Sequence, residues 1–469
     1  MEAINYTTIK KLAQELDCKI DDLIALAPGN DPFYMGVPRQ VRQAKWFADI
    51  WEKCGYGDEP AHIRAIHYNL TDAKEPTLLT DGTPYLNTDE HWDILVASSK
   101  YARYLGYISY DAIEDHRNDA YTYGSYTEDE HPQHVKAQVE TPYWFLPRID
   151  DVDLEMPRYL VHGYEYNLRD QPYHLEIWCE KSTMRKKIAP ICERYRVTYV
   201  EGEGELSLTG AMDLLRRIDD SGGKPTRIFY ISDFDLKGVE MPISMSRKIE
   251  YLVSTSHTDY DIKLLPIVLT LDQIDKYNLT RKPYQIKKGL QESRKKASKT
   301  RVKHFEEFYG HGVTELDALE AAMPGELARV ITDHIMRYRD LDISRRLSEQ
   351  HQEANEIVAD ELSEKINPYL IEMDQLREEA TALIARYQSE FNEQMRVYQE
   401  RADKLRDEIS RVAEDIESPL PERATAIVDG DDAGAQFLYD SSRNYFDQLA
   451  VYQRNQFKRV YKDGSGGRS

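Results

Sequence analysis

The chain has 469 residues and 41% hydrophobic residues, which is enough for two or three domains with cores of their own. It contains no 18-residue apolar run and no apolar segment after Lys10 and Lys11, which excludes a membrane-spanning helix and a signal peptide. Four cysteines without a C-x-x-C pair exclude a zinc ribbon and indicate a cytoplasmic protein, while the net charge of −22 requires that any DNA-binding face be local.

The N-terminal 150 residues are predicted to be mainly helical. Apolar residues recur at helical spacing from Thr7 to Leu26, with a break near Asp17, and again from Val41 to Trp51. The first segment is compatible with a helix-turn-helix and equally with an ordinary helical hairpin.

A helix-loop-helix-strand order follows in the same region. A helical pattern around His62–Leu70 precedes a loop with Gly82 and Pro84, a helix over Trp92–Tyr104 and a strand over residues 106–110. This order is typical of a winged helix, which places one helix in the major groove of DNA. We therefore expect a winged-helix DNA-binding domain over residues 1–150.

The segment Thr226–Gly238 reads T-R-I-F-Y-I-S-D-F-D-L-K-G and predicts a buried parallel strand that ends in an acidic turn. Ligands of open α/β sheets bind at the carboxyl ends of strands, where Asp233 and Asp235 would lie. Two carboxylates at this spacing suit Mg²⁺ or Mn²⁺, whose preferred ligands are oxygens. A chance D-x-D turn in an acidic protein is the alternative.

Two further strands precede this turn. His174–Cys179 is an apolar strand that ends at Glu180, and Tyr199–Glu201 runs into a glycine-rich turn followed by a helix through Met212 and Leu214. The order of strand-Glu, strand-glycine turn-helix and strand-D-x-D-x-x-G resembles the Toprim domain of topoisomerases, primases and some nucleases. The resemblance implies a Toprim domain over residues 155–345, with Glu180, Asp233 and Asp235 as Mg²⁺ ligands.

A second resemblance concerns Arg64 and Tyr68, which lie four residues apart in an R-x-I-[aromatic]-Tyr setting ahead of this domain. The layout is similar to the topoisomerase VI A subunit and its meiotic double-strand-break relative. In that family the matching tyrosine attacks a DNA phosphate, so Tyr68 would be the nucleophile and Arg64 its neighbour, with Glu180 in the catalytic set. His67 replaces the usual first aromatic residue. The alternative is that Tyr68 only edges a hydrophobic core.

Two more features bear on the site. Glu315 and Asp317 match a V-E-L-D-A-L-like element of the family, although helix capping is the favoured role for them. The segment from Arg281 to Lys303 is strongly basic, and we expect it to contact the DNA backbone rather than form a merely solvated face.

The C-terminal third lies outside the resemblance. Apolar residues at a 3-4 spacing from Met373 to Ile416 predict a coiled coil or long helical hairpin over residues 346–418, with a helix break at Asn367-Pro368 and a stutter at Phe391. Dimerisation or partner docking is its expected role, and packing on the core is the alternative.

We expect a helical segment and tail over residues 419–469. The stretch Asp429–Gly434 also fits D-x-D-x-x-G but lacks an acidic strand before it, so no metal is expected there.

The combined features predict an α/β-plus-α protein that cuts double-stranded DNA with Mg²⁺. The resemblance to the topoisomerase VI A subunit implies that it does so through a tyrosine, as a homodimer with a site shared between subunits. Two alternatives stay open: a hydrolytic Toprim nuclease without a tyrosyl intermediate, and a non-catalytic DNA-binding adaptor. No G-x-x-x-x-G-K-[ST] loop is present, so an ATPase would have to be a separate subunit. No membrane partner is expected.

Overall fold

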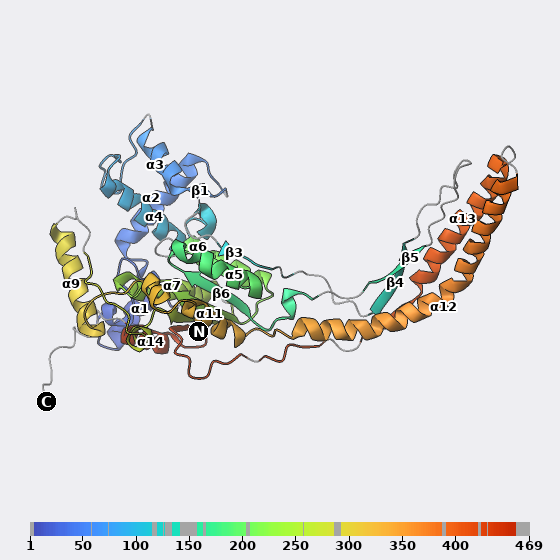
Figure 1. The fold of residues 1–469 in the computed structure, drawn as a ribbon. Helices are drawn as coiled ribbons and strands as arrows, with labels where there is room; N and C mark the ends of the chain where they lie inside the picture. Colours follow the sequence, from blue (N-terminus) through green and yellow to red (C-terminus); the bar gives the residue numbers. More distant parts are fainter. Residues whose placement is uncertain are drawn as a thin grey trace. The chain divides into compact units, whose positions relative to one another are not determined.

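The computed structural model describes residues 4–455 except 58, 74, 115–119, 125, 127–133, 141–156, 163–165, 203–206, 257, 286–291, 387–390, 421–423 and 429. The chain forms two compact units (Figure 1). Unit 1 comprises Met1–Tyr126, Pro172–Arg339 and Val428–Ser469, and unit 2 comprises Thr127–Gln171 and Asp340–Ile427. The units therefore differ from the four consecutive segments predicted from the sequence, because residues far apart in the chain pair in both.

The N-terminal part of unit 1 is helical, as predicted. Helix α1 (Tyr6–Glu15) is followed by α2 (Pro38–Cys54), α3 (Ile63–Thr71) and α4 (Asp89–Tyr104). Helices α2 to α4 enclose one core that includes Phe47, Ile66 and Leu95, each fully buried. The apolar stripes in the sequence thus form a small three-helix cluster.

The strand predicted at residues 106–110 is wrong. Gly106 has a φ of +72° and ends α4, with its N–H donating to Arg103 O and the Tyr107 N–H to Ala102 O. Ser109 then caps a 3₁₀ turn, Tyr110–Ala112. The extended segment comes later, at β2 (Ile113–Glu114), which pairs in parallel with β1 (Ala61–His62).

The centre of unit 1 is a mixed sheet with six strands among the described residues. Its strand order is β11-β9-β8-β6-β7-β3, from Tyr439–Asp440, Ile262–Val268, Thr226–Ile231, His174–Cys179, Thr198–Glu201 and Ala120–Tyr121 respectively. The four inner strands are parallel, and the two edge strands are antiparallel to their neighbours. The prediction of a mostly parallel central sheet is confirmed.

Helices cover both faces of this sheet (Figure 1). Alternate residues of each strand face opposite ways, so Ile228 and Tyr230 join one core while Phe229 and Ile231 join the other. The first core contains α6 (Leu208–Asp220), α7 (Leu236–Ser256) and α14 (Tyr445–Asn455). The second contains α5 (Arg185–Tyr195), α10 (Leu316–Ala322) and α11 (Glu326–Met336). Two further helices, α8 (Leu271–Lys276) and α9 (Glu292–Tyr309), follow β9.

The connections of the sheet reverse direction beside β6. From β6 the chain crosses through α5 to β7 on one side, and it then returns through α6 to β8 on the other side of β6. From β8 it continues outward through α7 to β9. The carboxyl ends of β6 and β8 therefore flank a topological switch point, the position where open α/β sheets bind ligands.

Unit 2 is a helical hairpin packed on a small antiparallel sheet. Helices α12 (Ile343–Arg386) and α13 (Phe391–Glu414) share one core with β4 (His134–Glu140). In the sheet, β4 lies between β10 (Glu417–Pro419) and β5 (Arg158–His162). The hairpin agrees with one of the two predicted arrangements. The sheet was not predicted.

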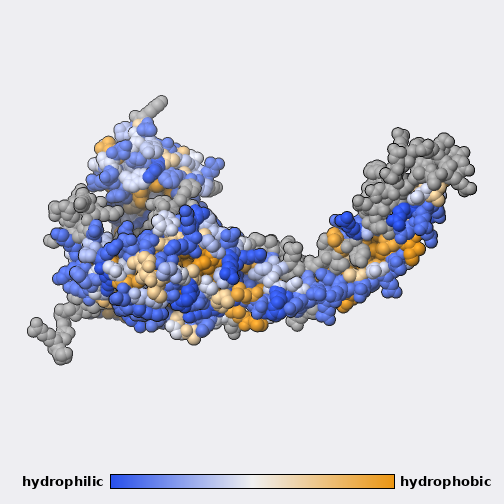
Figure 2. All heavy atoms as spheres, in the orientation of Figure 1, coloured by the Kyte–Doolittle hydropathy of each residue, from blue (hydrophilic) through white to orange (hydrophobic). Residues whose placement is uncertain are grey.

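The helix break predicted at Asn367-Pro368 is wrong, because α12 runs through Pro368. The buried side chains of Ile366, Met373 and Leu376 lie on both sides of the proline in the same core. Their packing outweighs the roughly 3 kcal/mol that a proline costs in a helix interior. Unit 2 also carries apolar side chains on its surface (Figure 2), among which Ile357, Ile371 and Val397 are more than half exposed.

None of the helices in the described residues is both long and apolar enough to cross a membrane.

Candidate functional site

Three of the predicted site residues lie at the switch point of the sheet. Glu180 follows β6 directly, and its N–H donates to Ile231 O at the end of β8 (3.2 Å). Asp233 and Asp235 follow β8 within four residues. The structure thus brings together the acids that the sequence placed on two separate strands.

Burial and like charges dominate the electrostatics of Glu180. Burial, and then the charges of Asp235 and Asp233, raise the pKa of Glu180 to about 7, although Lys237 and Lys181 oppose the shift. Its Oε2 atom is buried and has no hydrogen-bond partner among the described residues. Burial also raises the pKa of Asp235, although two backbone N–H groups oppose the shift. Carboxylates in such an arrangement repel one another unless a cation lies between them.

The D-x-D-x-x-G turn is built by backbone contacts around Asp235. Asp235 Oδ1 accepts hydrogen bonds from the N–H groups of Lys237 (2.9 Å) and Gly238 (2.8 Å), so it caps the start of α7. A Cβ atom on Gly238 would lie 1.9 Å from Asp233 O, which no side chain can tolerate. Gly238 is therefore required for the turn that positions the side chains of Asp233 and Asp235.

Asp233 is held by the segment before α10. Phe234 and Thr314 exchange two backbone hydrogen bonds, and the Leu316 N–H donates to Asp233 Oδ1 (2.6 Å). Glu315 stands at the N-cap position of α10, but its side chain makes no capping hydrogen bond. The capping role favoured for Glu315 is therefore wrong, since the side chain of Asp233 binds the free N–H group instead.

Lys181 is a site residue that the sequence analysis missed. Its Nζ atom lies 2.5 Å from Asp317 Oδ2, 3.5 Å from Asp233 Oδ1 and 3.8 Å from Glu315 Oε2. The only sequence signal for it was its position directly after Glu180. Through this ammonium group, Glu315 and Asp317 belong to the same cluster as the strand-end acids.

The donor set suits Mg²⁺ in its chemistry. All three acids offer oxygen ligands, and the unsatisfied Glu180 Oε2 together with the raised carboxyl pKa values indicates a missing positive charge. As the side chains lie, no three His, Cys, Asp or Glu residues in the described part of the chain converge in a metal-binding arrangement. Glu180, Asp233 and Asp235 are the residues that would hold the ion, with Lys181 next to Asp233.

A buried ion-pair network fixes β6 before it reaches Glu180. Glu176 is fully buried and accepts hydrogen bonds from Arg217 (2.8 and 3.0 Å) and Trp178 Nε1 (2.7 Å). His174 Nε2 lies 2.8 Å from Glu176 Oε1. Burial alone would raise the pKa of Glu176, but Arg217 and His174 lower it to about 2. This strand is therefore a rigid base for the acid at its end.

Tyr68 and Arg64 lie elsewhere in unit 1. Tyr68 is 56% exposed, and its ring centroid lies 5.6 Å from that of the buried His67. The two residues line a pocket of about 320 Å³ together with His67, Asn87, Asp89 and Trp92. Within the described residues, no hydrogen bond or ion pair joins Tyr68 or Arg64 to the three acids. One chain alone thus does not assemble all the residues predicted for catalysis.

The basic segment is largely engaged in structure where it can be described. Arg281 donates to the carbonyl groups of Tyr309, Gly310 and Gly312, and Arg301 pairs with Glu240. Lys287 and Lys288 lie outside the described residues, as do the side chains of Arg294, Lys295 and Lys296. The predicted DNA contact of this segment stays a prediction.

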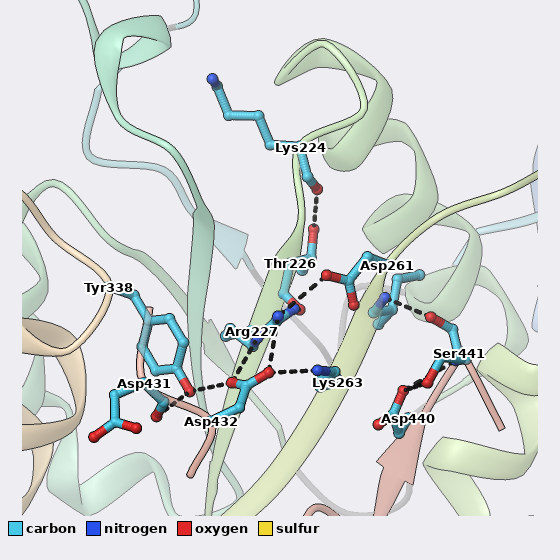
Figure 3. A network of polar contacts seen from close by, with 12 residues as sticks. Lys224, Thr226, Arg227, Asp261, Lys263, Tyr338, Asp431, Asp432, Asp440 and Ser441 are labelled. Carbon is cyan, nitrogen blue, oxygen red and sulfur yellow. Dashed lines mark hydrogen bonds and ion pairs between the residues drawn. The ribbon is translucent and has the colours of Figure 1, made fainter. Parts of the chain in front are cut away.

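The second D-x-D-x-x-G stretch supplies a structural clamp (Figure 3). Asp432 accepts from Arg227 on β8 (3.2 and 3.3 Å) and from the Tyr338 hydroxyl (2.6 Å), and it pairs with Lys263 on β9. Burial alone would raise the pKa of Asp432, but its contacts with Lys263 and Tyr338 lower it. A Cβ on Gly430 would lie 2.6 Å from the Tyr173 hydroxyl. The C-terminal segment is thus locked to the sheet, and the sequence signal for this role was the tight glycine turn.

Comparison with known protein families and with curated proteins finds no match to this chain.

Proposed function

We propose that the protein is a Mg²⁺- or Mn²⁺-dependent enzyme that cuts DNA strands, with a winged-helix domain around α2 to α4 and a Toprim domain around the central sheet. The observation that carries the proposal is the position of Glu180, Asp233 and Asp235 at the ends of neighbouring strands at the switch point, where Glu180 Oε2 is buried and has no hydrogen-bond partner among the described residues. Such a cluster needs a cation, and phosphate esters are the substrates whose charge a carboxylate-bound cation complements. When bound, Mg²⁺ would offset the negative charge that develops on the phosphate in the transition state.

In the favoured mechanism Tyr68 is the nucleophile. The Tyr68 hydroxyl loses its proton to solvent and its oxygen forms a bond to a DNA phosphorus atom. The bond from phosphorus to the 3′ oxygen breaks, and the released 3′ oxygen takes up a proton from solvent. The product is a 5′-phosphotyrosine. Arg64, one turn before Tyr68 on α3, would bind the phosphate oxygens as a cation with several donors. Lys181, next to Asp233, is suited to binding a neighbouring phosphate.

The separation of Tyr68 from the acids within one chain favours a homodimer in which each site takes Tyr68 from one subunit and the acids from the other. The same separation supports a second candidate, a Toprim nuclease that hydrolyses DNA with a water molecule while Tyr68 stays outside the chemistry. A separate ATPase subunit remains part of the proposal for the tyrosine mechanism.

The test is cleavage of supercoiled plasmid in Mg²⁺ or Mn²⁺, stopped with detergent and analysed with and without protease. Nicked or linear DNA that enters the gel only after protease treatment, and that is lost in Tyr68→Phe, supports the tyrosine mechanism. The matched control is Tyr107→Phe, which changes a 40% exposed tyrosine of the same region and should cleave normally.

Cleavage that is indifferent to protease, retained in Tyr68→Phe and lost in Asp233→Ala would assign the hydrolytic mechanism instead. Absence of cleavage with either metal, together with absence of any Asp233-dependent stabilisation by metal, would refute both mechanisms and leave a DNA-binding adaptor.

A further inference from the structure

The pocket beside Tyr68 has walls that are fixed before any ligand arrives. His67 is buried, with Nδ1 2.8 Å from the Tyr85 hydroxyl and Nε2 3.2 Å from Asn87 Oδ1. Its ring meets Trp92 edge to face, at a centroid distance of 5.2 Å and an angle of 90°. Because His67 is held at both nitrogens and Trp92 packs on it, these aromatic side chains form a preformed surface.

Three polar groups of the pocket lack partners. In the part of the chain that the structure describes, neither the Arg64 guanidinium nor the Asp89 carboxylate makes a hydrogen bond or an ion pair. Asn87 uses its Oδ1 atom for His67, which leaves the Nδ2 amide group as a donor. The pocket therefore presents a cation, a carboxylate acceptor and an amide donor beside aromatic rings.

This combination excludes some ligands and fits one class. The Asp89 carboxylate disfavours a phosphate in the pocket itself, so a phosphate would be bound at Arg64. A volume of about 320 Å³ lies at the lower end of the roughly 300–1,000 Å³ of small-molecule sites, which suits one planar group. A nucleobase stacks on aromatic side chains, and carboxylates accept hydrogen bonds from the amino groups of bases.

We propose that this pocket binds one unstacked nucleotide of a DNA strand, with its base against Trp92 and its phosphate on Arg64. Asp89 accepts a hydrogen bond from an exocyclic amino group, which cytosine, adenine and guanine carry and thymine lacks. The inference rests on the proposed function only in taking DNA as the substrate. It adds a base preference next to the proposed nucleophile and requires that the bound nucleotide be unpaired.

The test measures binding of the full chain, with EDTA present, to fluorescent single-stranded oligonucleotides. An oligothymidine is compared with the same strand carrying one central cytosine, and the duplexes of both strands serve as competitors. We expect the cytosine-containing strand to bind about fivefold more tightly than oligothymidine, the gain of one additional hydrogen bond to a base edge. We expect the two duplexes to compete equally, because a paired base cannot enter the pocket.

The deciding variant is Asp89→Asn. Its amide can donate to the O4 carbonyl of thymine, so the preference should fall to about onefold or reverse, a result that unfolding cannot mimic. Asp93→Asn, an exposed position one turn further along α4 and outside the pocket lining, is the matched control and should keep the preference.

Equal binding of both strands by the wild-type protein, an unchanged preference in Asp89→Asn, or unequal competition by the two duplexes would overturn the proposal. So would absence of binding to single strands. Plasmid cleavage is scored separately, so cleavage without any base preference would refute this pocket while leaving the proposed function intact.

Discussion

Replacing Glu180 by glutamine tests whether the acidic cluster is poised for a cation. The pKa of Glu180 is about 7 in the folded protein and 4.5 without the fold. Below pH 4.5 the group is protonated in both states and has no effect on stability. Between pH 4.5 and 7 the unfolded chain loses the proton first, so the free energy of unfolding falls as the pH rises.

The difference between the two pKa values corresponds to about 3 kcal/mol when the group is fully buried, and to about 2–3 kcal/mol here because part of the side chain meets solvent. This cost grows between pH 4.5 and pH 7 and is complete above pH 7, and Glu180→Gln removes it. The free energy of unfolding of Glu180→Gln relative to the wild type should therefore rise by about 2–3 kcal/mol from pH 4.5 to pH 8. Any effect of the amide that does not depend on pH cancels in this comparison.

The assay is urea unfolding at pH 4.5, 6, 7 and 8, first with EDTA and then with Mg²⁺. Mg²⁺ should stabilise the wild type more at pH 8 than at pH 6, since only the ionised cluster binds the ion well. Glu180→Gln should lose most of this response, and Glu193→Gln, an exposed glutamate on α5, should behave as the wild type. A relative stability of Glu180→Gln that does not change with pH would refute the reasoning.

Three other substitutions separate the site from its supports. Gly238→Ala places a Cβ atom 1.9 Å from a carbonyl oxygen, so it should lower the free energy of unfolding by about 2–4 kcal/mol and abolish the Mg²⁺ response. Its control is Gly29→Ala, which has open space around the new Cβ atom and should be nearly neutral. Asp432→Asn removes the carboxylate that Arg227 and Lys263 share, although Arg227 keeps Asp261, and should cost about 2–3 kcal/mol while the Mg²⁺ response persists. Glu176→Gln should cost about 3 kcal/mol at pH 7, and it should remove the stability that the wild type loses as the pH falls below 4.5 toward 2. Urea unfolding with and without Mg²⁺ measures all of them.

Each outcome can contradict the structural account. A well-folded Gly238→Ala protein with a normal Mg²⁺ response would show that the turn does not position the acids. Loss of the Mg²⁺ response in Asp432→Asn at retained stability would move the metal site toward the C-terminal segment. A neutral Glu176→Gln would show that the buried ion pair is not a support of β6.

The parallel strands and the acidic turns could be predicted from the sequence because they are local patterns. Residues 228–231 of β8 form an apolar run that ends at Ser232, and residues 177–179 of β6 form one that ends at Glu180. Parallel pairing then places both strand ends at one edge of the sheet, so Glu180 and Asp233 become neighbours without any knowledge of side-chain positions.

Side-chain partners far apart in the chain could not be predicted. Lys181 meets Asp233 across 52 residues, and Arg227 meets Asp432 across 205. No local pattern specifies such a pair, since any surface lysine or arginine has many acidic residues to choose from in this chain. The pocket beside Tyr68 escaped prediction for the same reason, because its walls come from α3 and from the start of α4.

Backbone preferences misled the prediction at two places where packing decides. Pro368 opposes a helix locally, but buried residues on either side hold α12 together. The aromatic residues at 107 and 110 favour a strand, but the positive φ of Gly106 places this segment in the C-terminal cap of α4.

The order in which the chain can fold follows from its non-consecutive pairing. In unit 2, β4 (His134–Glu140) must wait for β10 (Glu417–Pro419), and in unit 1, β9 (Ile262–Val268) must wait for β11 (Tyr439–Asp440). During synthesis both units therefore remain unfinished until almost the whole chain has left the ribosome. Contacts over such long sequence separations slow folding, and the open edges of β4 and β9 are exposed to wrong partners in the meantime.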